Sequence, residues 1–356
     1  MTQKAALPYN LKRFSFLNMQ KIMKRKNSGK LKICLAAVLC VLILTGCGRA
    51  SGRDPQAEAA QPLRIVATIF PPFDMARGIS GGQAQVRMLL RPGEEVHSYE
   101  PTPQDILAIQ DADLFLCVGG ENDVWLEGIL ESMGENAPEV IRLLDLVETV
   151  TEEEKEGMTS REHHHHDEEE GESSEEEEEP DEHVWTSPSN TIRMTEAIAQ
   201  RMETLDPENA AVYRENAASY IREIEELRDD FDTLVRNAPC RTLVFGDRFP
   251  IRYFVEEFGL DYYAAFPGCA EDTEPSAATM VYLIETVKRE KLPVIFSIEF
   301  SNGAIADAIA EASGASRLTW QTCHNVTLDQ FEAGETYASL MRQNLAALKA
   351  ALYPEN

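Results

Sequence analysis

Short apolar runs alternate with helix-like segments along most of the chain, and this alternation is the feature that most limits its fold. Amphipathic segments with a helical period lie between successive runs. Strands that alternate with helices pair in parallel within one sheet, so the pattern predicts an α/β fold. The runs that we expect to be strands begin at Leu63, Val86, Ala112, Val140, Thr242, Gly259, Val294 and Ser316. We expect Pro71 and Pro72 to end the first strand in a loop, residues 277–290 to form a helix, and the strand from Val294 to end at Ile298.

A long helical segment separates these runs into two sets. Residues 191–204 and 207–237 are predicted to be helical, and Pro207 lies near the first turn, where a missing N–H is harmless. Apolar residues recur near a period of 3.6, and about 30 helical residues would span about 45 Å. We therefore predict two lobes, each with a mostly parallel sheet flanked by helices, joined by a long spine helix. The N-terminal lobe would be 62–190, the linker helices 191–238 and the C-terminal lobe 239–356.

An acidic, histidine-rich tract interrupts the first lobe. Of the 31 residues from Glu152 to Glu182, 17 are Asp or Glu, and almost none are apolar. Such a composition cannot bury enough surface to offset the entropy of ordering, so it predicts a disordered loop. The tract also contains His163, His164, His165 and His166. Imidazoles and carboxylates bind borderline divalent metals, which indicates an accessory metal-binding loop rather than a plain acidic linker or a tag.

The N-terminus has the pattern of an export signal. A basic cluster between Lys21 and Lys32 precedes the apolar run 33–44, which is too short for a spanning helix of about 20 residues. The sequence Leu44-Thr45-Gly46-Cys47 then matches a bacterial lipobox. We predict a signal peptide at 1–46, lipidation of Cys47 and a polar tether at 47–61. This places the protein at the extracytoplasmic face of the cell membrane, held there by its lipid anchor.

The charge balance narrows the classes of partner. The whole chain has a formal charge of −28, and residues 1–46 contribute nine Lys or Arg and no Asp or Glu. Their removal leaves 24 Lys and Arg against 61 Asp and Glu, a formal charge of −37. Nucleic-acid binding needs a basic face, so this class is excluded, whereas an anionic protein favours cations.

Three histidines remain outside the tract, and each lies where a loop is expected. They are His97, His183 and His324. A single loop histidine is usually just solvated. Three of them on separate loops of a two-lobed fold, with none elsewhere outside the tract, point to one shared metal site.

The residues around two of these histidines resemble a known family. His97-Ser98-Tyr99-Glu100-Pro101-Thr102-Pro103 and Asp181-Glu182-His183-Val184-Trp185-Thr186-Ser187-Pro188 are similar to the two metal-ligand motifs of the solute-binding lipoproteins of zinc and manganese ABC importers. The resemblance extends over 63–352 and includes the patterns at 300–314 and 337–344. It implies capture of a metal ion between the lobes and delivery to an ABC permease. A histidine-rich insertion is typical of the zinc-type members.

The resemblance leaves the third ligand open. The family supplies His or Glu from the first loop of the second lobe, where this chain reads Phe245-Gly246-Asp247-Arg248-Phe249-Pro250. Arg248 stands at the ligand position and cannot coordinate a metal because it stays charged. We therefore expect Asp247 to be the ligand, with an N-cap or a partner for Arg248 as its alternative role. His324 stands where manganese-type members have Asp, which favours Zn²⁺ over Mn²⁺.

The resemblance also implies roles for further side chains. Some zinc-type members have a disulfide between loops of the second lobe, so a Cys269–Cys323 bridge is predicted. Two free thiols, or a thiolate ligand from Cys323, are the alternatives. Glu274 and Glu299 are near the expected cleft and are candidates to orient a ligand histidine, with ordinary loop charges as the alternative.

Three function classes follow from these observations. The leading one is a lipid-anchored, monomeric zinc receptor of an ABC importer, with a manganese receptor of the same family as the alternative. A metalloenzyme is the second class, and it is disfavoured because the chain has no His-Glu-x-x-His and no glycine-rich phosphate loop. The third class is a metal-storage or adhesin protein that uses the acidic tract.

Overall fold

The computed structural model describes residues 61–158, 180–268 and 274–354. The described residues all belong to one compact unit. In the described segments, no helix is both long enough and apolar enough to cross a membrane. The predicted signal peptide, Cys47 and most of the tether lie outside the described residues.

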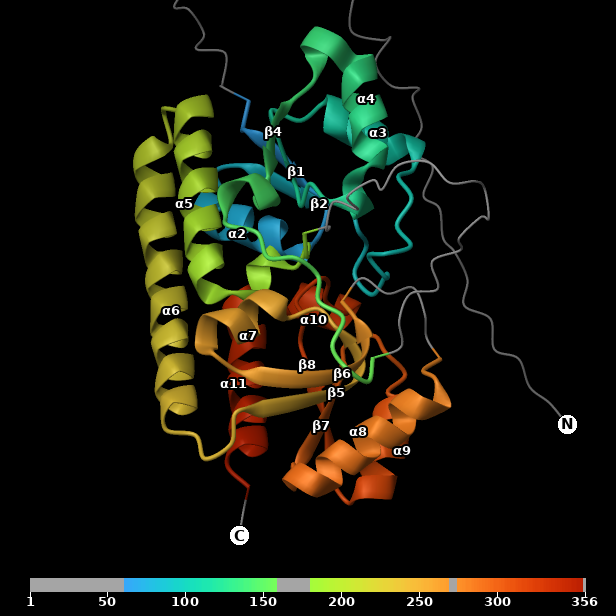
Figure 1. Cartoon of the computed structure of the whole chain (residues 1–356). Coiled ribbons are helices and arrows are strands. Elements are labelled where there is room, and N and C mark those ends of the chain that lie inside the picture. Colours follow the sequence, from blue (N-terminus) through green and yellow to red (C-terminus); the bar gives the residue numbers. More distant parts are fainter. Residues whose placement is uncertain (1–60, 159–179, 269–273, 355–356) are drawn as a thin grey trace, which may run out of the picture. The chain divides into compact units, whose positions relative to one another are not determined.

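Two four-stranded parallel sheets form the framework of this unit, and they share one topology (Figure 1). The first sheet has the order β2-β1-β3-β4 and the second the order β6-β5-β7-β8. The strands of the first sheet are β1 (Arg64–Ala67), β2 (Gln85–Met88), β3 (Leu114–Cys117) and β4 (Glu139–Arg142). Those of the second are β5 (Thr242–Phe249), β6 (Asp261–Pro267), β7 (Val294–Ile298) and β8 (Ser316–Trp320).

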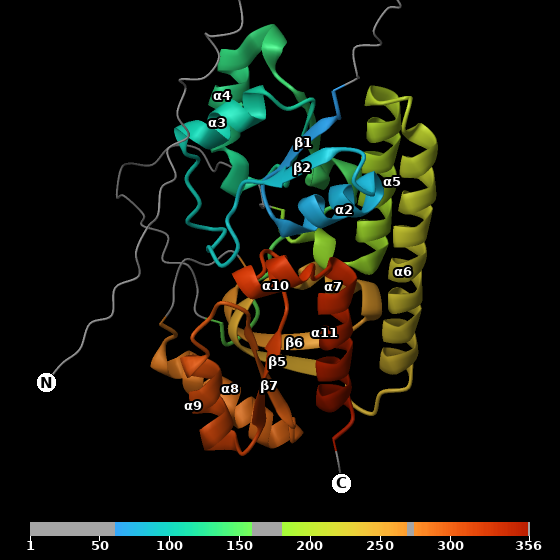
Figure 2. The same cartoon turned by 180° about the vertical axis from the view of Figure 1, so that it is seen from behind.

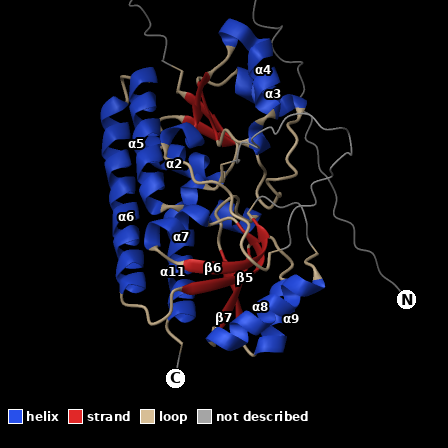
Figure 3. Ribbon diagram, viewed as in Figure 1, coloured by secondary structure: helices blue, strands red, loops and turns tan. Residues whose placement is uncertain are grey.

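Helices cover both faces of each sheet. The first sheet is accompanied by α2 (Phe70–Ser80), α3 (Pro103–Gln110) and α4 (Trp125–Met133). The second is accompanied by α7 (Arg252–Phe258), α8 (Ala277–Glu290), α9 (Ala304–Ser313), α10 (Leu328–Ala333) and α11 (Tyr337–Leu352). Figure 3 shows the strands enclosed between these helices, which is the layered arrangement that parallel sheets require.

Alternate residues of each central strand enter different hydrophobic cores. In β3, Leu114 and Leu116 join the largest core, whereas Phe115 and Cys117 join a smaller one beneath α3 and α4. In the second sheet, the opposite face packs against α8 and α9 in a third core. The largest core contains side chains from both sheets, so it packs the two lobes against each other.

Two long antiparallel helices connect the sheets, α5 (Pro188–Leu205) and α6 (Ala210–Arg236) (Figures 1 and 2). α6 is about 40 Å long at 1.5 Å per residue. Near its start, the Tyr220 hydroxyl donates to Asp74 Oδ2 of α2 at 3.0 Å. Near its end, the Leu234 carbonyl accepts from the Tyr353 hydroxyl at 2.8 Å. The helix therefore contacts both lobes, as the predicted spine requires, although it starts three residues later than predicted.

Other local predictions need correction. Pro71 and Pro72 were expected to end the first strand in a loop, but they lie in the first turn of α2, where proline is tolerated. The short helix α10 was not predicted. The predicted disordered tract 152–182 is ordered at both ends, because Lys155 Nζ pairs with Asp261 at 2.6 Å and Asp181 is buried.

Candidate metal centre

Three histidines lie together at the carboxyl ends of the strands of both sheets. His97 follows β2, His324 follows β8, and His183 precedes the short 3₁₀ turn Val184–Thr186 that leads into α5. One ligand nitrogen from each lies within 4.8 Å of the other two, and this group is the metal-ligand cluster found among the described residues. The three sequence-predicted histidines are therefore brought together by the fold, at the position where parallel α/β sheets usually bind ligands.

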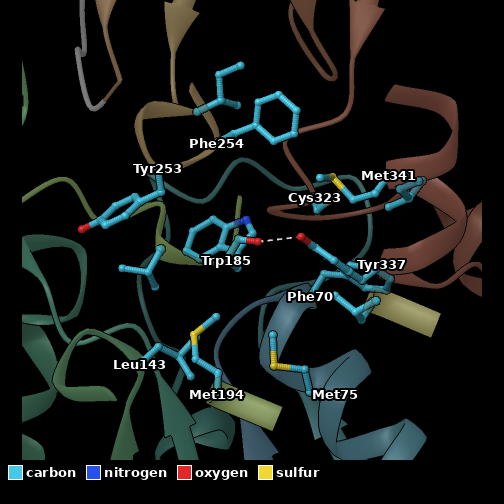
Figure 4. Packing of buried hydrophobic residues seen from close by; sticks show 14 of the residues in the cluster. Phe70, Met75, Leu143, Trp185, Met194, Tyr253, Phe254, Cys323, Tyr337 and Met341 are labelled. Atoms are coloured by element: carbon cyan, nitrogen blue, oxygen red, sulfur yellow. Dashed lines mark hydrogen bonds between the residues drawn. The ribbon is translucent and has the colours of Figure 1, made fainter. Parts of the chain in front are cut away.

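His183 is fixed by the residue two positions before it. Asp181 Oδ1 accepts from the His183 backbone N–H at 2.8 Å and lies 2.9 Å from His183 Nδ1. The Trp185 indole N–H donates to the Thr322 carbonyl at 2.9 Å, and the Tyr337 hydroxyl donates to the Trp185 carbonyl at 2.7 Å. Figure 4 shows this last bond inside the packed core. The His183 segment is thus attached to the second lobe through both the indole side chain and the backbone carbonyl of Trp185.

His324 is oriented through a hydroxyl and a carboxylate. Its Nδ1 is hydrogen-bonded to the Thr322 hydroxyl, which donates to Glu299 Oε1. Glu299 Oε2 also accepts from the Thr322 backbone N–H at 2.6 Å. Cys323 lies between them with a left-handed φ of 65°, which turns the chain so that the side chains on either side of it meet. Glu299 is therefore connected to His324 through Thr322, and its orienting role stays a prediction.

His97 is held by an amide and by the neighbouring loop. Its Nδ1 lies 3.4 Å from Asn122 Oδ1, and the Asn122 amide donates to Glu182 Oε2 at 2.6 Å. The Asn325 amide donates to the carbonyls of Arg91 (2.7 Å) and Glu94 (2.9 Å), in the loop before His97. The residue after His324 therefore positions the loop that carries His97.

The surroundings of the cluster favour the neutral form of His97 and of His324. Burial lowers the pKa of His97 to about 3, and His183 and Arg248 act in the same direction. Burial also holds the pKa of His324 well below its usual value, with the other two histidines and Arg248 contributing. A neutral imidazole can donate a lone pair to a metal without first losing a proton.

The hydrogen bonds leave one nitrogen of each ring for a metal. All three Nδ1 atoms have protein partners, so each Nε2 remains for coordination. His324 Nε2 is buried and has no hydrogen-bond partner among the described residues. A buried polar atom without a partner is unfavourable, and a bound cation would satisfy it. The donor set therefore fits a metal that prefers nitrogen ligands.

Asp247 does not join the three histidines, contrary to our prediction. Its Oδ1 accepts from the Arg248 backbone N–H at 3.0 Å, and its Oδ2 accepts from the Ile298 backbone N–H at 3.3 Å. Both oxygens are thus used to hold the ends of β5 and β7. The Arg248 guanidinium instead pairs with Glu95 of the first lobe at 3.2 Å, beside His97.

The remaining predicted site residues are Glu274 and the two cysteines of the predicted disulfide. Glu274 is exposed and does not line the cavity that contains the three imidazoles. Cys323 is a buried free thiol whose pKa is raised by burial, so it is a poor thiolate ligand. Its predicted partner Cys269 lies outside the described residues, as do Cys47 and residues 163–166, and the disulfide is not confirmed.

Several residues that build the site were not found from the sequence. Glu182, Thr322 and Asn325 are ordinary polar residues within loops, and Asn122 lies in the short 3₁₀ helix Glu121–Asp123. The role of Asp181 could have been predicted, because a carboxylate two residues before a ligand histidine can fold back onto the Nδ1 atom of that histidine.

The fold and the site together define a two-lobed α/β protein with a largely buried cluster of three imidazoles that could hold a metal ion. A family model described as "Zinc-uptake complex component A periplasmic" matches residues 65–351. The chain therefore belongs to the ZnuA family of zinc-uptake components.

Curated relatives and solved structures agree with this assignment. The chain is 30% identical over 316 residues to the zinc-binding lipoprotein AdcA of Streptococcus pneumoniae, covering 88% of this chain and 60% of AdcA. It is 29% identical to the high-affinity zinc uptake system protein ZnuA of Bacillus subtilis, covering 88% of this chain and 95% of that protein. The crystal structure of the Zn(II)-bound ZnuA-like domain of Streptococcus pneumoniae AdcA has a TM-score of 0.67 at 26% identity, over 82% of this chain and 99% of that domain.

Proposed function

We propose that this chain is a lipid-anchored extracytoplasmic receptor that captures Zn²⁺ in the cleft between its lobes and delivers it to an ABC permease. The observation that carries this proposal is the cluster of His97, His183 and His324, whose ligand atoms lie within 4.8 Å of one another. The family match and the zinc-binding names of the relatives support the choice of cargo and of transport system.

Zinc is preferred over manganese because of the donor atoms. Three neutral nitrogens suit the tetrahedral N and S sites of zinc, whereas manganese prefers oxygen ligands. The one described carboxylate that was expected to coordinate, Asp247, is engaged by two backbone N–H groups. The proposed ligand set is therefore His97, His183 and His324.

The small cavity between the imidazoles suits a single ion. Its volume is about 20 Å³, which is room for about one water molecule. A larger cavity of about 550 Å³ also reaches His97, beside Asp247 and Arg248, so the proposal of a receptor rather than an enzyme rests on the donor set and on the family match. A receptor needs only to enclose the ion and release it.

The proposed anchor and the acidic tract complete this function. Lipidation of Cys47 would keep the monomeric receptor beside its permease. His163 to His166 would collect zinc weakly and pass it to the site, since the described chain resumes at Pro180, beside the buried Asp181.

Zinc titration against a competing chelator tests the proposal. We expect one tight site in the metal-stripped protein, retained when residues 159–179 are deleted and in large excess of Mn²⁺. The His324→Ala variant should lose at least about two orders of magnitude in affinity, because a ligand is removed. A variant with alanine at His163 to His166 is the matched control and should keep the tight site. Loss of tight binding with the tract, while His324→Ala binds normally, would instead support metal storage.

A further inference from the structure

Among the described residues, three that line one small cavity have a buried polar atom without a hydrogen-bond partner: Thr68, Tyr99 and His324. The pKa of Tyr99 is raised by burial and by the Asp105 carboxylate, which lies close enough to act on the Tyr99 hydroxyl, and this leaves Thr68 and His324 to be explained. Thr68 Oγ1 and His324 Nε2 have no hydrogen-bond partner among the described residues, and the two residues are 3% and 8% exposed. The cavity of about 20 Å³ is lined by both of them, and also by His97 and His183. The metal accounts for His324 Nε2, but it does not account for a neutral hydroxyl.

The backbone on both sides holds Thr68 in this position. Its N–H donates to the Leu116 carbonyl at 3.0 Å, and its carbonyl accepts from the Leu90 N–H at 3.0 Å. It directly follows β1 at the centre of the first sheet, and a β-branched side chain has few rotamers to choose from. The hydroxyl therefore cannot easily turn toward another partner, and leaving it unpaired is unfavourable.

A zinc ion bound by the three histidines needs one more ligand. Zinc in proteins is usually four-coordinate. Where the protein supplies three ligands, a water molecule takes the fourth position, and a neutral threonine hydroxyl is not among the usual zinc ligands. We propose that Thr68 is a positioning residue: its hydroxyl hydrogen-bonds a water molecule that completes the coordination of the bound Zn²⁺. This inference rests on the proposed function. One water needs about 10–15 Å³, and the cavity of about 20 Å³ admits about one, beside the nitrogen atoms that would hold the ion.

The hydroxyl can be removed without changing the shape of the side chain. Thr68→Val replaces it with a methyl group, and Thr68→Ser keeps it while removing the methyl. In the full chain purified in mild detergent, we expect Thr68→Val to bind zinc about tenfold more weakly in a chelator competition, with Thr68→Ser close to the wild type. The melting temperature of metal-stripped Thr68→Val should be equal to or higher than that of the wild type, because an unpaired buried hydroxyl is lost.

We thus expect weaker zinc binding without a loss of stability, a combination that a merely structural role would not produce. If Thr68 only supports packing, Thr68→Val should melt earlier without metal and bind zinc normally, and the inference is overturned. A wild type that has no tight zinc site overturns the proposed function itself. A wild type that binds zinc through His324 while Thr68→Val binds equally well overturns only the inference.

A measurement on the wild type keeps the inference testable if Thr68→Val does not fold. Co²⁺ can replace zinc as a spectroscopic probe, and pulsed EPR in D₂O detects an exchangeable water on the metal. We expect one such water. Its absence would show that the fourth ligand comes from the protein, for example from residues outside the described segments, and would contradict the role of Thr68.

Discussion

Asp181 Oδ1 lies 2.9 Å from His183 Nδ1, and both side chains are about 1% exposed. A carboxylate in this position fixes the tautomer of the imidazole and raises the basicity of its other nitrogen. His97 and His324 have longer connections to carboxylates, through Asn122 and Thr322 respectively. Each of the three proposed ligands thus has its own acidic support, and His183 has the most direct one.

Removal of the charge on Asp181 should weaken zinc binding. Asp181→Asn keeps the shape and can still accept a hydrogen bond, but it no longer stabilises positive charge on the imidazole. We expect zinc affinity to fall about tenfold in a chelator competition. Asp111→Asn, at the exposed end of α3, is the control and should bind as the wild type does. Equal affinities in both variants would contradict this role of Asp181.

The link from Glu299 to His324 should depend on one hydroxyl. Thr322→Val breaks the connection while keeping the side-chain volume, so His324 loses its orienting partner. We predict about a tenfold loss of zinc affinity, measured in the same titration. Thr322→Ser retains the hydroxyl and should bind nearly as tightly as the wild type. The prediction is wrong if the serine variant is as weak as the valine variant.

Arg248 should oppose metal binding. Its positive charge lowers the pKa of His97 and His324, and the same field repels a divalent cation. Arg248→Gln should therefore raise zinc affinity by about threefold to tenfold, and more at low ionic strength. Arg91→Gln is the control, because Arg91 lies on the loop before His97 but is 74% exposed. Unchanged or weaker binding in Arg248→Gln would exclude this electrostatic effect.

Asp247 should matter for stability rather than for zinc. Asp247→Asn leaves one acceptor oxygen for two backbone N–H donors. We expect urea unfolding of the metal-stripped protein to show a loss of about 1–2 kcal/mol, and zinc affinity to stay within about twofold. A large loss of affinity with normal stability would restore Asp247 as a ligand.

The bond between Tyr337 and Trp185 should contribute to the packing of the two lobes. Tyr337→Phe removes a donor to a buried carbonyl and should lower the free energy of unfolding by about 1–2 kcal/mol in urea. Tyr353→Phe is the comparison, because its hydroxyl also donates to a carbonyl but the ring is only partly buried. A smaller effect for Tyr337→Phe than for Tyr353→Phe would count against the argument.

Much of the fold was predictable because local patterns determine it. The helix Ala277–Glu290 and the strand Val294–Ile298 begin and end where the sequence predicts. Alternation of strands and helices implied two parallel sheets, and a period near 3.6 implied the long helix α6. Pro71 was misplaced because proline is compatible with both a loop and a first helical turn. A segment as short as α10 shows no clear helical period, so its sequence is also compatible with both a loop and a helix.

The sequence by itself determined which residue types were available for a metal, because only three histidines lie outside the acidic tract. It also indicated two lobes and the loops that carry these residues. Only the tertiary structure decided that Asp247 binds backbone N–H groups, and that Thr68 and Asn122 line the site. Such roles depend on contacts between residues far apart in the chain, and no local spacing encodes them. Burial makes these contacts necessary, because a polar group removed from water must find a partner.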